Sequence, residues 1–377
     1  MSFRFSRRVD GVRDWLASQT DAKAVLITNL EHVKYITGFT GSNGIALISK
    51  DFAVFITDGR YLLQASVEVT GFETRIVGQA ILLLEAARVL TIKGFTGGLA
   101  IESNTLSVDA WNTLIGGLPS AINLVPASGI VEPIKAIKEP QEIDAIRRAC
   151  ALVDEACTHI TEIVKTGMTE AELAWRIEVY VRERGAVRMG FDSIIGSGPN
   201  AAIIHGRAGN RGIGSSGEPE FLLCDFGCEI DGYNSDITRT YVFGEPSARQ
   251  REIWQLEKAA QAAAFAKAQI GVACGEVDTA ARAVLAAGGL SKDYDLPGLP
   301  HRTGHGIGLD IHEWPYLVRG NPQPLLPGMC FSNEPMICLE GEFGVRLEDH
   351  FYMTEQGPRW FTEPAYSVDD PFGLNRV

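Results

Sequence analysis

The sequence predicts two domains, a three-layer α/β domain over residues 1–130 and an α+β domain over residues 131–377. The length of 377 residues is typical of about two domains. Short apolar strands alternate with helices in the first third of the chain. In the remainder, two helices followed by strands occur twice, with a period of about 110 residues. This repetition indicates two similar halves that form a curved antiparallel sheet with helices outside it.

The first domain is expected to begin with strands and to continue with alternating helices and strands. Three strand-like runs, AVLIT, IALIS and AVFIT, follow one another from Ala24 onward. Next come a helix near Tyr61, a strand TRIVG, a helix from about residue 80, a strand GLAIE, a helix around Asp109 and a strand INLVP. The region contains no cluster of His, Cys, Asp and Glu with the spacing of metal ligands. This domain alone therefore indicates no function.

The second domain is expected to begin with two helices. Pro140 opens a long amphipathic helix, because proline is tolerated in the first turn. Thr169 and Glu172 form a predicted capping box for the next helix. Two further helices are predicted near Ser247 and from Gly275. Strands are predicted between and after these helices, over residues 191–195, 304–312, 329–335 and 345–354.

One stretch, FLLCDFGCEIDGYNSDITRTYVFG, is predicted to form a central β-hairpin. Its Asp231-Gly232 dipeptide favours a two-residue type I′ turn. With that turn, Gly227 lies opposite Asp236, and Asp225 becomes the diagonal neighbour of Asp236 on the same face. Two carboxylates so placed repel each other. Either they are solvated on an open face of the sheet, or a pair of divalent cations lies between them.

Charge and cysteine content exclude several classes of protein. The net charge of −13 argues against nucleic acid or an anionic membrane surface as a partner, because both attract excess Lys and Arg. No apolar run approaches the roughly 20 residues that span a bilayer. The N-terminal stretch MSFRFSRRVDGVRDWL lacks the apolar segment of a signal peptide. The seven cysteines lack paired spacings, so we expect reduced thiols in a cytoplasmic protein.

A second group of candidate ligands follows the hairpin. Three of the seven histidines, His301, His305 and His312, fall within twelve residues and are interleaved with glycines. Glu334 and Glu348 come next, each at a predicted strand. Two Asp, two Glu and one His form a hard, oxygen-rich ligand set, which suits Mn²⁺ or Co²⁺ and also Zn²⁺ or Fe²⁺. Two such ions about 3.5–4 Å apart can activate a shared water.

Together these motifs resemble those of the pita-bread-fold metallopeptidases of the proline-specific branch, which includes prolidase (Xaa-Pro dipeptidase) and aminopeptidase P. The motifs are DFGCEIDGYNSDITRT, HRTGHGIGLDIH, NEP and GVRLED, in the family's order. The resemblance covers the chain from about Glu139 to Gly357. It extends more loosely to the first domain, where YITGFTGSNGIALI and TDGRYLLQA are similar to the creatinase-type N-terminal domain.

The resemblance implies a metal centre with two divalent ions per chain. The implied ligands are Asp225, Asp236, His305, Glu334 and Glu348. Asp236 and Glu348 would bridge the two ions. Glu334 would also be the general base toward the hydroxide that bridges them.

The same resemblance assigns residues to the substrate. His205 and His312 would hold the scissile carbonyl and the charge that develops on its oxygen. His301 and Arg346 match positions near the leaving proline and its carboxylate. Arg346 shares a face of the last predicted strand with Glu348 by the period of two. Two roles stay open for Arg346: it pairs with the substrate carboxylate, or it braces the ligand carboxylates.

The expected activity is hydrolysis of the Xaa-Pro peptide bond, in dipeptides ahead of longer peptides, by a protein that the resemblance implies to be a homodimer. The alternatives are aminopeptidase P activity, hydrolysis of another small C–N substrate of the creatinase or ectoine-hydrolase type, and a non-catalytic domain that binds peptides. The chain departs from the family after Glu334. The sequence EPMIC replaces the family's E-P-G-x-Y, so that Cys338 stands in place of a tyrosine.

Overall fold

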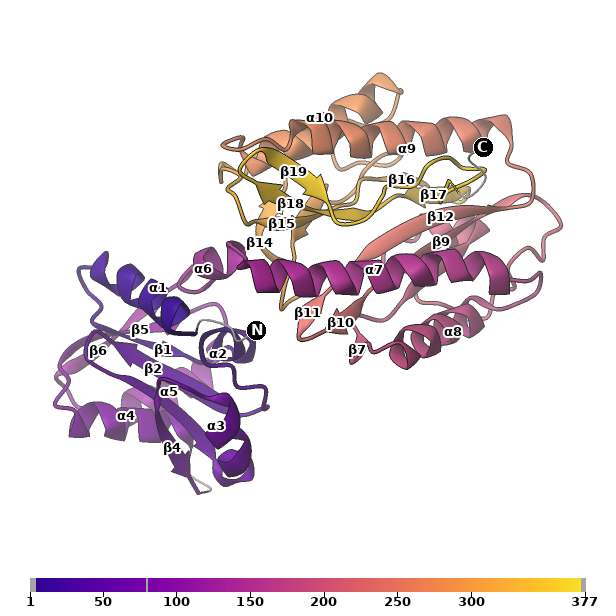
Figure 1. The fold of residues 1–377 in the computed structure, drawn as a ribbon. Coiled ribbons are helices and arrows are strands. Elements are labelled where there is room, and N and C mark those ends of the chain that lie inside the picture. Colours follow the sequence, from indigo (N-terminus) through magenta and orange to yellow (C-terminus); the bar gives the residue numbers. More distant parts are fainter. Residues whose placement is uncertain (1–4, 79–80, 374–377) are drawn as a thin grey trace. The chain divides into compact units, whose positions relative to one another are not determined.

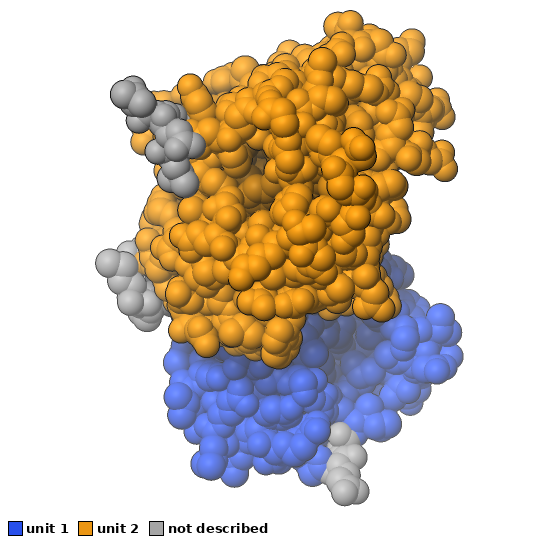
Figure 2. Space-filling model, turned by 90° about the vertical axis from the view of Figure 1, so that its right-hand side faces the viewer, with its two compact units in different colours: residues 1–135 blue, residues 136–377 orange. Residues whose placement is uncertain are grey.

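The structure is a computed structural model that describes residues 5–78 and 81–373 (Figure 1). The chain divides into two compact units, Met1–Lys135 and Ala136–Val377, which Figure 2 draws in different colours. The division falls within α6 (Glu132–Ala136), a few residues after the expected position. Each unit contains its own cluster of buried apolar side chains, as an independent domain requires.

The first unit contains a six-stranded sheet with the strand order β4-β3-β2-β1-β5-β6. Its first three strands pair antiparallel, whereas β4, β5 and β6 each join a neighbour in parallel. All six strands predicted from the sequence are confirmed. They are β1 (Ala24–Ile27), β2 (Gly44–Ser49), β3 (Ala53–Asp58), β4 (Glu73–Val77), β5 (Gly97–Glu102) and β6 (Ile122–Ala127).

Helices cover both faces of this sheet and make three layers (Figure 1). Leu26 of β1 packs into the cluster that includes side chains of α4 and α5. Its neighbour Val25 is also fully buried and faces the opposite layer, because alternate residues of a strand point to opposite faces. The helices of the unit are α1 (Phe5–Ala17), α2 (Leu30–Thr37), η1 (Gly59–Tyr61), α3 (Leu62–Glu68), α4 (Leu82–Ile92) and α5 (Val108–Gly117).

Two of these helices, α1 and α2, are absent from the sequence prediction. α1 buries Val9 and Leu16 on one face. α2 is capped at its N-terminus by Asn29, whose side chain accepts a backbone hydrogen bond of 2.9 Å from the first turn, and at its C-terminus by Gly38, which has a φ of 84°. The Asn cap and the Gly stop were the signal in the sequence. The helix expected from about residue 80 begins at Leu82, and residues 79–80 lie outside the described part of the chain.

Four long helices form the outer layer of the second unit, at the positions predicted from the sequence. They are α7 (Pro140–Ile163), α8 (Glu170–Glu183), α9 (Ala248–Lys267) and α10 (Cys274–Ala287). In Figure 1, many strands of the unit are drawn between α7 and α9, and others are drawn below α7, beside α8. No helix within residues 5–78 and 81–373 combines the length and the apolar character needed to cross a membrane.

The caps of these helices are partly as predicted. Pro140 occupies the first turn of α7. The predicted capping box of α8 is only half formed. Thr169 accepts a hydrogen bond from the backbone N–H of Glu172 at 3.1 Å. The Glu172 carboxylate instead accepts from Arg176 at 2.7 Å, since an ion pair one turn ahead competes for it.

The central hairpin has the predicted register and turn. Ile230 pairs with Tyr233, and both turn residues have positive φ, 52° for Asp231 and 86° for Gly232. At Gly227 the hairpin divides, so that β9 and β12 join β8 while β10 and β11 join β7. The strands are β7 (Arg188–Met189), β8 (Ile194–Ser197), β9 (Glu220–Phe226), β10 (Cys228–Ile230), β11 (Tyr233–Asn234) and β12 (Ile237–Phe243); the short helix η2 (Gly198–Ala202) follows β8.

Two of the three predicted later strands differ from the prediction, and the strands Glu313–Leu317, Met336–Leu339 and Gly357–Trp360 were not predicted. The strand expected over residues 304–312 ends at Gly306, after a register shift, and residues 307–312 form a loop. The strand expected over residues 345–354 is interrupted at Glu348, because its backbone N–H donates to Thr238 of the hairpin at 3.0 Å. The strands are β13 (Gly304–Gly306), β14 (Glu313–Leu317), β15 (Cys330–Asn333), β16 (Met336–Leu339), β17 (Phe343–Arg346), β18 (Asp349–Thr354) and β19 (Gly357–Trp360).

All seven cysteines are free thiols and are buried. Burial raises the pKa of each thiol, because the charged thiolate is poorly solvated inside the protein. The pKa rises to about 11 or 12 at Cys157, Cys228, Cys274, Cys330 and Cys338. It rises well above the ordinary value at Cys150 and Cys224.

We expect Gly227→Ala to destabilise the second unit. A Cβ atom on Gly227 would lie 1.7 Å from the backbone oxygen of Ser235, so the two hairpin strands would have to separate. A loss of about 2 kcal/mol corresponds to a decrease in Tm of about 4–8 °C, measurable by thermal unfolding. The control is Gly116→Ala on the exposed side of α5, where an added Cβ meets nothing within 4 Å. Equal Tm values for the two variants would contradict this reading of the hairpin.

Candidate active site

Three buried carboxylates meet where the hairpin approaches the chain between β17 and β18. Asp225 comes from β9, Asp236 directly precedes β12, and Glu348 follows β17. One carboxylate oxygen of each lies within 4.8 Å of the others. Their exposed fractions are 5%, 6% and 1%, so the carboxylates are not solvated on an open sheet face. Of the two interpretations of the hairpin acids, the structure favours the one that requires cations.

Electrostatics support the same conclusion. Burial raises the pKa of Asp225, and burial with repulsion from neighbouring acids raises the pKa of Asp236 and Glu348 well above the ordinary value. Asp225 Oδ1, Asp236 Oδ1 and Glu348 Oε1 are buried without a hydrogen-bond partner. Buried acceptor atoms that face one another without donors are stabilised by a bound cation.

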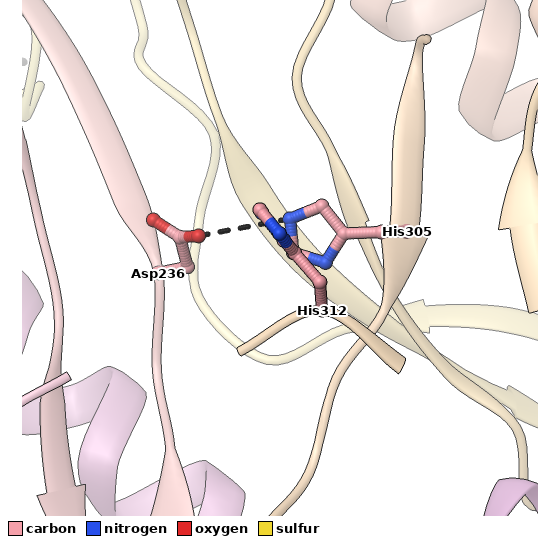
Figure 3. A group of neighbouring side chains, drawn as sticks. All are labelled: Asp236, His305 and His312. Carbon is pink, nitrogen blue, oxygen red and sulfur yellow. Dashed lines mark ion pairs between the residues drawn. The ribbon is translucent and has the colours of Figure 1, made fainter. Parts of the chain in front are cut away.

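His305 adds a candidate nitrogen ligand to this cluster. Its Nδ1 lies 3.0 Å from the backbone oxygen of Gly306, so that Nδ1 carries the proton that this bond needs. Its Nε2 faces two carboxylates, Asp236 Oδ2 at 3.6 Å (Figure 3) and Glu334 Oε1 at 3.2 Å. Nε2 therefore faces two anions, and either a proton or a metal ion can occupy the space between them.

Glu334 completes the group of predicted ligands. It follows β15, and its backbone N–H donates to Thr303 at 2.8 Å. Burial acts to raise its pKa, but the hydrogen bond and the charge of His305 lower the pKa below its ordinary value, so Glu334 is ionised. A ligand atom of Glu334 lies within 4.8 Å of those of His305 and Glu348. All five predicted ligands therefore converge.

The five residues fit two hard divalent ions. One possible ligand group contains Asp225, Asp236 and Glu348, and another contains His305, Glu334 and Glu348. Glu348 belongs to both. Asp236 likewise belongs to a group with His305 and His312. A carboxylate shared between two groups can bridge two ions, so the overlap supports the bridging roles inferred for Asp236 and Glu348.

His312 lies beside the ligands on the loop between β13 and β14. Its ring centroid is 4.3 Å from that of His305, and the two rings are inclined at 72° (Figure 3). Desolvation in the cleft, followed by the neighbouring His305 ring, lowers the pKa of His312 to about 4, although the side chain still reaches solvent. His312 is therefore neutral near pH 7, with an N–H available to a substrate carbonyl.

A cavity of about 480 Å³ adjoins the carboxylate cluster. It brings together all the predicted substrate-side residues with Glu334. Burial lowers the pKa of His301 to about 4, and its buried Nε2 has no hydrogen-bond partner. The lining residues are Ile204, His205, His301, Arg302, His312, Val318, Glu334 and Arg346. A second cavity, of about 780 Å³, shares His205 and extends toward Trp175 and Phe191.

His205 lies on a loop whose stabilising contacts were not predicted from the sequence. Glu170, which is fully buried at the start of α8, accepts hydrogen bonds from Ser197 N at 2.8 Å, Asn200 Nδ2 at 3.1 Å and Gly209 N at 3.2 Å. These bonds hold both sides of the loop that carries His205. A glutamate in the first turn of a helix gave no signal in the sequence beyond its capping position.

Arg346 is engaged with Asp225, one of the candidate metal ligands. Its guanidinium forms an ion pair with Asp225, and Nε donates to Thr238 Oγ1 at 3.1 Å. Arg302 was not singled out from the sequence, yet it lines the same cavity. Its guanidinium carbon lies 4.6 Å from the ring centroid of Tyr316, and no ion pair among residues 5–78 and 81–373 includes it. Its guanidinium is therefore available to a bound anion.

Cys338 does not line the cavity. It is fully buried in β16 within the apolar core, and its backbone N–H donates to Gly298 at 3.0 Å. The position that departs from the family pattern is thus occupied by a core residue, with no space shown for a larger ring.

Comparison with known proteins agrees with this fold and site. Residues 144–355 match metallopeptidase family M24, and residues 8–137 match the creatinase/prolidase N-terminal domain. The uncharacterized peptidase YqhT of Bacillus subtilis is 37% identical over 348 residues, which cover 92% of this chain and 95% of that protein. A Xaa-Pro dipeptidase of Lactobacillus helveticus is 36% identical over 264 residues, or 70% of each chain.

Two solved structures have the same fold across both units. The Xaa-Pro dipeptidase from Bacillus anthracis has a TM-score of 0.89 and 32% identity, and the match covers 96% of this chain and 98% of that chain. The X-Pro aminopeptidase from Thermotoga maritima has a TM-score of 0.82 and 30% identity, with 94% and 97% covered. Because the match to family M24 covers more than half of this chain, the chain belongs to metallopeptidase family M24. It is a metallopeptidase with a creatinase/prolidase N-terminal domain.

Proposed function

We propose that this protein hydrolyses the Xaa-Pro bond of dipeptides. The observation that carries the proposal is a single cavity in which His205, His301 and His312 join Glu334 and Arg302. The relatives named Xaa-Pro dipeptidase support the Xaa-Pro bond as the bond that is cleaved. The similarity to an X-Pro aminopeptidase makes cleavage of longer Xaa-Pro peptides the second candidate.

The five converging ligands support two divalent ions per chain, Mn²⁺ or Co²⁺ ahead of Zn²⁺ or Fe²⁺, because the set is rich in carboxylate oxygen. When bound, these ions supply Lewis acidity and a water that is acidic enough to act as nucleophile near neutral pH. Glu334, ionised and directed into the cavity, accepts the proton of the attacking water.

The other residues act on the substrate. The rings of His205 and His312 line the cavity and can donate to the scissile carbonyl oxygen as negative charge develops on it. An Xaa-Pro bond is a tertiary amide without an N–H, so the leaving proline nitrogen must receive a proton. Glu334 can return the proton that it has taken from the water.

The free end of a dipeptide calls for a cation close to the metal centre. Arg346 lines the cavity but is paired with Asp225. Arg302 lines the cavity without an acidic partner among residues 5–78 and 81–373, so we assign the substrate carboxylate to Arg302 and the bracing of Asp225 to Arg346.

We also infer a cytoplasmic homodimer. Seven free, buried cysteines fit a reducing compartment. The dimer rests on the family resemblance and is tested by light scattering of the purified chain during gel filtration. A single species at the mass of one 40.9 kDa chain would contradict it.

The first prediction of this proposal separates a metal ligand from a substrate-side residue. The purified protein is expected to bind about two divalent ions per chain, as measured by elemental analysis. His305→Ala is expected to lose about one ion, because Nε2 points into the ligand cluster. His312→Ala should keep both ions and lose about 10²-fold in kcat. His159→Ala, which breaks a pair with Glu162 on α7, is the control. Equal metal loss in the first two variants would contradict the assigned roles.

The second prediction concerns substrate length. The wild type is expected to cleave an Xaa-Pro dipeptide with at least about tenfold higher kcat/KM than the matched tripeptide, since one charge-assisted bond of about 1.4 kcal/mol is lost. Arg302→Ala should remove this preference by lowering only the dipeptide value. Arg346→Ala should instead lower metal content. Arg249→Ala, which breaks an exposed pair with Glu342, is the control. Equal or better cleavage of the tripeptide would favour the aminopeptidase P alternative.

A further inference from the structure

We infer that a buried ion pair between Lys138 and Glu313 positions His312. Lys138 Nζ lies 2.9 Å from Glu313 Oε2, and the two side chains are 1% and 0% exposed. Lys138 directly precedes the cap of α7, and Glu313 is the first residue of β14, next to His312. This inference rests on the proposed function, because it concerns a residue to which we assign a role in turnover.

The loop that carries His312 is built around the Glu313 carboxylate. The backbone N–H of Asp310 donates to Glu313 Oε1 at 3.1 Å. The carboxylate therefore points back into the loop that precedes Glu313. A Cβ atom on Gly308 would lie 2.9 Å from both carboxylate oxygens of Glu313. The glycine at this position therefore leaves space for the carboxylate. Within GIGLDIHE, the glycine and the glutamate thus shape the loop that carries the histidine.

The opposite end of the same loop is attached to the central hairpin. The backbone N–H of Asn234 donates to Gly308 at 2.9 Å, and its side-chain Nδ2 donates to Leu309 at 2.7 Å. Asn234 is two residues from the ligand Asp236. The loop is thus fixed on one side to the hairpin and on the other side to Lys138, with His312 between the two anchors.

Stability alone is a weak reason for such a pair. Two charges removed from water lose their solvation, and replacement of both by uncharged residues is often neutral or stabilising. The pair instead fixes the position and the orientation of Glu313, the residue next to His312. Lys138 is itself fixed, since its backbone N–H donates to Gly328 at 2.9 Å. A fixed cation that holds the residue next to His312 limits the positions available to the imidazole.

The test compares the loss of one partner with the loss of both in the metal-loaded full chain. Lys138→Met leaves the Glu313 carboxylate buried and unpaired, and should lower Tm by about 5–10 °C. The double variant Lys138→Met/Glu313→Gln retains an acceptor for Asp310 N and should recover most of that loss. The control double variant, Lys267→Met/Glu276→Gln, removes an exposed pair of 3.7 Å.

Hydrogen exchange reports on the loop without any assay of activity. The backbone N–H of Ile307 donates to Cys330 at 3.2 Å, and that of Gly308 donates to Asp310 at 3.1 Å. In Lys138→Met/Glu313→Gln, these amides should exchange at least about tenfold faster than in the wild type and in the control. Unchanged exchange would overturn the inference.

Turnover shows whether the pair acts through His312. The double variant should retain about two ions per chain and lose about tenfold in kcat, with KM changed less than twofold. In a His312→Ala background, the same double substitution should change kcat by less than about twofold, because the residue that it positions is gone. An equal loss in both backgrounds would overturn the inference. If the wild type cleaves no Xaa-Pro peptide, the proposed function fails, and the exchange rates still decide whether the pair anchors the loop.

Discussion

Mutual repulsion among buried carboxylates is the constraint on which the second unit depends. Asp225, Asp236, Glu334 and Glu348 converge in a space where burial and neighbouring acids raise the pKa of Asp236 and Glu348 well above the ordinary value. An acid cluster of this kind is stable only with compensating positive charge. Arg346 supplies one permanent charge by its ion pair with Asp225. The carboxylate oxygens of this cluster that have no hydrogen-bond partner are therefore the atoms best placed to bind divalent ions.

Rigid supports hold these ligands against their repulsion, and they come from distant parts of the chain. Arg239, which is 1% exposed, donates to the backbone oxygen of Glu348 at 2.8 Å and pairs with Asp349 at 2.8 Å. Thr238 donates to Glu348 Oε2 at 2.7 Å. The hairpin thus carries Asp225 and Asp236, and it also fixes the segment that carries Glu348. The same hairpin, through Asn234, holds the loop of His312.

The sequence made the hairpin and its register predictable because Asp231-Gly232 fixes the turn, and every later pairing follows from it. The five candidate ligands were identified through motifs carried by a family resemblance, and the structure brings these five side chains together. Features set by tertiary contacts were not predictable. Glu348 leaves the expected strand because it bonds to Thr238, 110 positions earlier in the chain. The pairing of Arg346 with Asp225 spans 121 positions, and no local spacing signals it.

The seven buried thiols have a practical consequence for studying how the two units move. A maleimide reacts with the thiolate, and burial makes the native thiolates both scarce and inaccessible. A cysteine introduced at an exposed site such as Val67 in the first unit, and another at Trp175 in the second, would then take up a fluorescent dye selectively. Energy transfer between the two dyes would measure the distance between units in solution, with the natural cysteines left in place.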